Sequence, residues 1–218
     1  MIRKHISRTL CALLLLGAAS AVSAGEMTAD AVITKNLEAR GGLDTIRAIK
    51  TMTLEGTMTM GGMEAPMHIE IKQPDRVRTE FTMQGMTAVM AYDGTTGWGI
   101  MPFMGKTEPE EMPADQLKDM LEQSDIEGPL VDYADKGHKV EYLGVEEVEG
   151  TEAHKLRLTR KNGDVVDLFF DTEYFLEFRQ EGKREMQGQE VEFVVNIGDY
   201  KEVGGMMMAH SVEAVLGG

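Results

Sequence analysis

Apolar and polar residues alternate through the stretch from residue 51 to residue 98, which predicts consecutive β-strands that share one apolar face. In the first segment, Met52 and Leu54 alternate with threonines and Glu55. The Gly61-Gly62 pair favours a tight reversal of the chain, and the alternation continues after it. Because many of the apolar positions are methionine, we expect a meander with a methionine-rich face.

Helical segments are predicted on both sides of this meander. Thr28 is a suitable N-cap for a helix that runs to about residue 40, and Gly41-Gly42 ends it before a short second helix at residues 43–49. A further helix is expected over residues 113–124, because proline is favoured in the first turn of a helix.

Strand patterns resume at residue 138 and continue to residue 215, with glycine-containing turns between them. Asn162-Gly163 is the strongest hairpin signal of the sequence. All but one of the connections are short, which favours antiparallel pairing. We therefore expect about eleven strands and a mainly β fold of the α+β class.

The predicted helices are too small to cover one face of such a sheet. About eleven strands of ~25 Å at ~4.8 Å spacing present about 1,300 Å², whereas about 40 helical residues cover about 600 Å². The sheet must then curl until its own side chains fill the middle, or leave an apolar cavity. Methionine suits such a cavity, because its unbranched, polarizable side chain repacks around ligands of variable shape. The alternative is that these methionines are ordinary core.

The candidate cavity wall consists of apolar positions from both strand regions. A fatty chain buried there gains on the order of 10 kcal/mol before ordering costs, at about 0.8 kcal/mol per CH₂ group. The predicted wall is Met52, Leu54, Met58, Met60, Met67, Ile69, Phe81, Met83, Met90, Phe193 and Val195.

Two smaller groups complete the predicted site. The helix at residues 113–124 is expected to plug the cavity, and an apolar loop before it, within residues 99–112, is expected to form a rim. The plug would consist of Leu117, Met120 and Leu121, and the rim of Met101, Phe103 and Met104.

The first 24 residues have the pattern of a signal peptide. A basic start is followed by an apolar stretch and by Val22-Ser23-Ala24, which fits the small-x-small cleavage rule. We expect cleavage after Ala24, export to the periplasm and a single mature domain over residues 25–218. The one cysteine, Cys11, falls in the signal, so the mature chain is expected to have no disulfide.

The formal net charge is −15, and removing Arg3, Lys4 and Arg8 with the predicted signal makes it −18. This charge argues against binding nucleic acid, and against anionic lipid surfaces held by charge. No catalytic pattern is found: Ser124 and Ser211, the serines after the signal, lie outside a nucleophile elbow.

The histidines of the predicted mature chain lack metal-ligand spacing, and no phosphate-binding glycine loop occurs. We therefore expect a protein that is not an enzyme and that uses no cofactor or metal. These histidines are His68, His138, His154 and His210.

Four features occur together: a glycine break after the first helix, a Thr-x-x-Gly strand opening, a Tyr-Asp-Gly turn that leads to tryptophan, and a helix inserted between two meanders. They lie at Gly41-Gly42-Leu43 with Ile46 and Ile49, at Thr53-Leu54-Glu55-Gly56, at Tyr92 to Trp98 and at residues 113–124. In this combination the chain resembles the LolA/LolB-like superfamily, specifically the outer-membrane lipoprotein-sorting proteins.

The resemblance implies a curved antiparallel sheet that forms an unclosed half-barrel, whose concave apolar face is lidded by an N-terminal helix and the mid-chain insertion. It implies a non-catalytic, monomeric periplasmic carrier or binding protein for acyl chains of lipoproteins or other lipids. Inner- or outer-membrane envelope proteins are its candidate partners. The family's lid arginine lies near the first strand, where this chain has only Arg47 in the short helix, so that role is not transferred. The alternative function is a non-catalytic protein-interaction or sensor domain of the cell envelope on the same fold.

Overall fold

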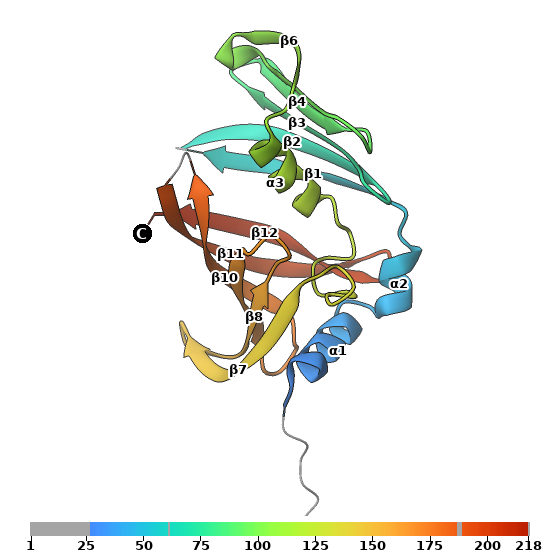
Figure 1. The fold of residues 1–218 in the computed structure, drawn as a ribbon, viewed down its shortest axis with the longest axis vertical. Coiled ribbons are helices and arrows are strands. Elements are labelled where there is room, and N and C mark those ends of the chain that lie inside the picture. The colour runs from blue at the N-terminus through green and yellow to red at the C-terminus, as the bar shows by residue number, and fades with distance from the viewer. Residues whose placement is uncertain (1–26, 61, 187–188, 218) are drawn as a thin grey trace, which may run out of the picture.

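The computed structural model describes residues 27–60, 62–186 and 189–217. Within these ranges, twelve strands form two antiparallel six-stranded sheets, and three α-helices and one 3-10 helix accompany them. Figure 1 shows the two sheets one above the other. The predicted signal peptide, residues 1–24, lies outside the described residues.

The first sheet, named sheet A, is a meander whose strands follow chain order. Pairing places Met52 opposite Ile71, and Met67 opposite Phe81, so the alternation predicted from the sequence becomes one apolar face. The strands are β1 (Thr51–Met60), β2 (Met63–Lys72), β3 (Arg76–Met83), β4 (Met86–Tyr92), β5 (Gly97–Met101) and β6 (Lys106–Glu111), with the 3-10 helix η1 (Pro102–Met104) before the last.

The second sheet, named sheet B, is also a sequential meander. Asn162-Gly163 lies in the turn of its β8–β9 hairpin, as the sequence predicted. The strands are β7 (Lys139–Val148), β8 (Thr151–Thr159), β9 (Val165–Asp171), β10 (Glu177–Met186), β11 (Gln189–Val203) and β12 (Met206–Leu216).

Helix α1 (Ala29–Ala39) begins at the predicted cap, where the Thr28 hydroxyl accepts a hydrogen bond from the backbone N–H of Ala31 at 3.2 Å. This helix covers the apolar face of sheet B, and it forms a core with Leu130 from the segment after α3. The fully buried members of this core are Val32, Ile33, Leu130, Leu156, Leu158, Val166, Leu168 and Phe170.

Two further helices flank the strands of sheet A: α2 (Leu43–Ala48) precedes β1, and α3 (Ala114–Gln123) follows β6 directly after Pro113. Helix α3 lies on one end of sheet A and forms a second, smaller core there. Its buried members are Ile71, Val77, Met112, Met120 and Ile126.

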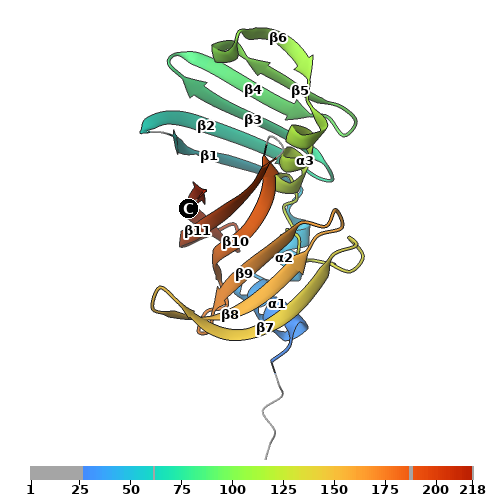
Figure 2. The same ribbon diagram turned by 60° about the vertical axis from the view of Figure 1, so that its left-hand side comes forward.

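The predicted mainly β, unclosed architecture with helices against the apolar faces is confirmed. The strands form two sheets because α3 and the segment after it run between the two meanders (Figure 2). The loop expected at residues 99–112 was wrong in large part, since residues 99–101 belong to β5, residues 102–104 form η1 and residues 106–111 form the edge strand β6. All six residues of β6 are exposed, and the strand is held by backbone pairing with β5. Its sequence has no apolar alternation from which a strand could be predicted.

Glu177, the first residue of β10, has an unusual environment for a carboxyl group. Burial raises its pKa from the ordinary value of 4.5 to about 7, although a hydrogen bond from Gln180 Nε2 at 2.8 Å opposes the shift. The Tyr200 hydroxyl donates a 2.6 Å hydrogen bond to the Glu177 backbone carbonyl. Between about pH 5 and pH 7 the folded protein therefore keeps a proton on this carboxyl group that the unfolded chain releases.

Replacing this carboxyl with an amide should change how stability depends on pH. Between pH 5 and pH 8 the unfolded carboxyl loses its proton first, so the wild-type free energy of unfolding should fall by roughly 1–3 kcal/mol as the pH rises. In Glu177→Gln this fall should disappear. Burial lowers the pKa values of His138 and His154, which should leave the variant with a slight opposite slope. Urea unfolding at four pH values measures both curves, and equal slopes would contradict the assignment.

Candidate functional site

The apolar side of sheet A is called here the methionine-rich face. Cross-strand pairing brings its residues together in rows, with Leu54 opposite Ile69 and Met67 opposite Phe81. Most of the predicted wall residues on this face are half-buried, and Leu54 is 36 % exposed. The Met60 side chain lies outside the described part. The face divides into an end that α3 covers and an end that it does not cover.

At the covered end, α3 approaches the sheet backbone closely. A Cβ atom at Gly97 would lie 2.8 Å from Leu117 Cδ1 and 3.2 Å from Met112 Sδ. Met120 is buried in the core at this end, and Leu117 packs against it. Leu121, the third predicted plug residue, instead lines a hollow of about 510 Å³ on the side of sheet B. Met112 is also buried in this core, but it was not predicted from the sequence, because the residues before it show no apolar alternation.

At the uncovered end, small residues form the floor. Ala65 lies opposite Met58, and Ala88 lies opposite Phe81. Both alanines are buried, although α3 packs at the other end of the sheet. The longer side chains that surround the alanines must therefore cover them. The Phe103 ring of η1 lies 5.7 Å from that of Phe81. This end is therefore closed by flexible side chains.

The rim and wall residues do not form one continuous surface. Of the predicted rim, Met101 and Phe103 are half-buried, and Met104 is 63 % exposed. Phe193 of β11 packs against the α1 core, whereas Met52 of β1 packs against the α3 core. The predicted wall residues are thus divided between two sheets. The alternation along the chain indicates which face of a strand is apolar, but it does not indicate which helix packs against that face.

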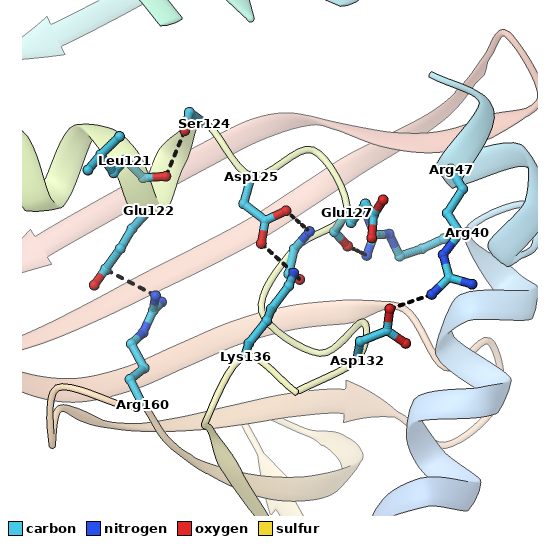
Figure 3. A network of polar contacts seen from close by, with 11 residues as sticks. Arg40, Arg47, Leu121, Glu122, Ser124, Asp125, Glu127, Asp132, Lys136 and Arg160 are labelled. Atoms are coloured by element: carbon cyan, nitrogen blue, oxygen red, sulfur yellow. Dashed lines mark hydrogen bonds and ion pairs between the residues drawn. The ribbon is translucent and has the colours of Figure 1, made fainter. Parts of the chain in front are cut away.

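Polar contacts attach α3 and its following segment to sheet B (Figure 3). Arg160 Nη1 pairs with Glu122 Oε2 at 3.0 Å, and Lys118 pairs with Asp164 of the same β8–β9 hairpin. Helix α3 therefore has an apolar side on sheet A and a charged side on sheet B.

The two arginines that follow the first helix hold the segment after α3. Arg47 forms an ion pair with Asp132, and Arg40 Nη1 donates to the Glu127 carbonyl at 3.4 Å (Figure 3). Lys136 Nζ reaches Asp125 at 2.6 Å within the same segment. The sequence analysis left Arg47 without a role, since its partner lies 85 positions away.

Further hollows lie away from the methionine-rich face. One of them, about 920 Å³, is lined mainly by charged residues of β8 to β11, where Arg157 forms a bidentate pair with Asp167 at 2.7 and 2.9 Å. Burial opposes ionisation of Asp167, but the hydrogen bond from Arg157 and the charge of Lys155 lower its pKa overall. These charges pair with one another and stabilise the sheet.

Groups suited to metal binding or acid–base chemistry are scarce. Among the described residues, no cluster of three or more His, Cys, Asp or Glu side chains has a geometry that could hold a metal ion. His154 is buried, with its Nδ1 3.1 Å from the Tyr142 hydroxyl and its ring 5.1 Å from that of Phe175. Burial and the nearby charge of Lys35 lower its pKa, which favours the neutral ring. This histidine is a satisfied core residue.

None of the described helices has the length and apolar character that crossing a membrane requires. No protein-family model and no curated protein sequence matches the chain. Solved structures do match its fold. A LolA superfamily protein from Nitrosomonas europaea has 13% sequence identity and a TM-score of 0.54, covering 87% of this chain and 86% of that one.

A DUF1329 family protein from Desulfovibrio piger has 12% identity and a TM-score of 0.54, covering 86% of this chain and 90% of that one. A putative outer membrane lipoprotein-sorting protein domain from Vibrio parahaemolyticus has 13% identity and a TM-score of 0.49, with coverages of 84% and 86%. At these identities the likeness concerns the fold, and the LolA-like fold expected from the sequence is confirmed.

The contact of α3 with Gly97 can be tested by adding one methyl group. Gly97→Ala should destabilise the protein by about 1–3 kcal/mol, because the new Cβ overlaps Leu117 and Met112. Gly99→Ala on the same strand is the matched control, since the nearest atom to its Cβ is Met101 Cε at 3.9 Å. Urea unfolding measures both variants, and equal stabilities would show that α3 does not rest on this strand.

Proposed function

We propose that the protein is a periplasmic carrier or binding protein for the acyl chains of lipoproteins or other lipids, and that it is not an enzyme. The supporting observation is the end of the methionine-rich face that α3 leaves uncovered, where Met58, Met67 and Phe81 lie over an alanine floor. The signal-like start of the sequence supports export. The likeness of the fold to that of a LolA superfamily protein also supports the proposal.

The chemistry of this face suits an acyl chain. Methionine and phenylalanine side chains can turn aside and then pack along a chain of CH₂ groups, each worth about 0.8 kcal/mol on burial. Entry would occur past η1, whose Met104 is the most exposed of the three rim residues. The ligand would replace contacts that the side chains now make with one another.

A second function, a non-catalytic protein-interaction or sensor domain of the cell envelope, has its own supporting observation. Helix α1 packs against part of the apolar face of sheet B, and α3 packs against one end of sheet A. A protein whose faces are partly occupied by its own helices would bind its partner on an outer surface or a strand edge. The two functions differ in whether the uncovered end takes up lipid.

Lipid extraction followed by mass spectrometry, together with titration of a fluorescent fatty acid, tests the proposal. Met67→Gln should weaken fatty-acid binding at least about tenfold, because an amide buried without hydrogen bonds costs about 1–3 kcal/mol. His68→Gln is the matched control, since the next residue along a strand points to the opposite face. Fatty-acid binding should be unchanged in this control.

The absence of both co-purified lipid and fatty-acid uptake in the wild-type protein would contradict lipid binding and favour the interaction domain. Equal effects of the two substitutions would show that the ligand does not lie on the methionine-rich face.

A further inference from the structure

The outer face of sheet A, opposite the methionine-rich face, has a groove of about 430 Å³ that crosses β1 to β4. Three consecutive residues at each of the four strands line it. The middle residues of these triplets lie opposite one another and pack in or against the α3 core, so their side chains point to the other face; they are Met52, Ile71, Val77 and Tyr92. Their backbone is therefore the floor of the groove, and the flanking residues form its two walls.

One wall brings two positive charges together. Lys72 and Arg76 are direct cross-strand partners, and both side chains are exposed. Like charges directly opposite each other destabilise an antiparallel pair. The chain has 37 acidic and 22 basic residues, so acidic partners are not in short supply. Within the part of the chain that the structure describes, neither side chain forms a hydrogen bond or an ion pair. The third base of the groove, Arg78 on the other wall, is paired with Glu80 at 2.7 Å.

The acidic residues that line the groove are engaged by other groups. Asp93 Oδ1 accepts hydrogen bonds from two backbone N–H groups of its own turn at 2.8 and 2.9 Å. These bonds lower the pKa of Asp93, and the charge of Arg76 adds a smaller effect. Glu70 Oε1 lies 3.5 Å from His68 Nε2. The charges of Lys72 and Arg76 therefore remain available to a ligand in the groove.

These two charges match those of a phosphate group. A phosphate monoester carries about −1.5 to −2 charges at pH 7 and has three strong acceptor oxygens. Arginine binds phosphate through its planar fork of donors, and lysine binds it as a point charge. The Thr51 hydroxyl, directly opposite Lys72, is a further donor on the same wall. We propose that the groove is a binding site for a small, water-soluble phosphate monoester, held by Lys72 and Arg76. The proposal does not rest on lipid binding, because the groove lies on the opposite face of the sheet.

Isothermal titration calorimetry of the full chain with glycerol 3-phosphate, in a low-salt buffer, tests the site. One equivalent should bind saturably, whereas glycerol should not bind. Lys72→Gln and Arg76→Gln should each weaken binding at least about fivefold, because each removes a charge-assisted hydrogen bond to the phosphate.

The matched control is K139Q/K201Q, two exposed lysines of β7 and β11 in sheet B. It removes as much positive charge as K72Q/R76Q does, so it reports any effect of net charge alone, and it should bind glycerol 3-phosphate as the parent does. Thermal unfolding should show that K72Q/R76Q is at least as stable as the parent, because the opposed like charges are gone. Weaker binding by that variant would then not result from unfolding.

Three results would overturn the site: no saturable binding of glycerol 3-phosphate, equal losses in K72Q/R76Q and K139Q/K201Q, or binding to phosphatidylglycerol vesicles without binding of the soluble ester. The last result would indicate a membrane surface as the ligand instead. Fatty-acid titration of K72Q/R76Q separates this proposal from the proposed function. Fatty-acid binding should be unchanged in this variant, since both substitutions lie on the face opposite the methionine-rich face.

Discussion

Each sheet of this protein has one apolar face, and two short helices supply most of the cover for both faces. Helices α1 and α3 have 11 and 10 residues, so each is only about 16 Å long, shorter than the strands that it crosses. Helix α1 packs against sheet B in a core of eight buried side chains, five of which belong to β8 and β9. On sheet A the cover stops partway along the strands, and the properties of the uncovered end follow from that shortage of helix.

Helix α3 joins the two halves of the molecule through two kinds of contact. Its apolar side lies so close to β5 that a Cβ atom at position 97 would lie 2.8 Å from Leu117 Cδ1. Its charged side reaches the β8–β9 hairpin through pairs such as Arg160–Glu122 (Figure 3). Partly exposed ion pairs contribute about 0–1 kcal/mol each. Apolar packing on sheet A therefore dominates the attachment of α3, and the charges mainly set its orientation toward sheet B.

The two ends of the methionine-rich face consequently offer different chemistry from similar residues. At the covered end, Met112 and Met120 are buried and fill irregular gaps in the core. At the turns, Met63 and Met86 are partly exposed, and their neighbours cover the alanine floor. An apolar ligand would exploit that accessibility, because the flexible side chains can turn aside and pack along it.

Elements with strong local signals could be predicted without the structure: the Thr28 cap of α1, the Asn162-Gly163 hairpin and the alternation of β1 to β4. The apolar face of each of these strands could also be predicted, because side-chain direction follows from a period of two. Strand β6 escaped detection, because an exposed edge strand has no alternation and depends on backbone pairing.

Which helix covers which face follows from the docking of the helices in the folded protein. That choice placed Phe193 and Met52 in different cores, and it paired Arg47 with the distant Asp132. Contacts between residues far apart in the chain depend on how the helices dock and how the sheets lie relative to each other. Local periodicity predicts neither the docking of the helices nor the placement of the sheets. The extent of the uncovered methionine-rich face could therefore be seen only in the folded protein.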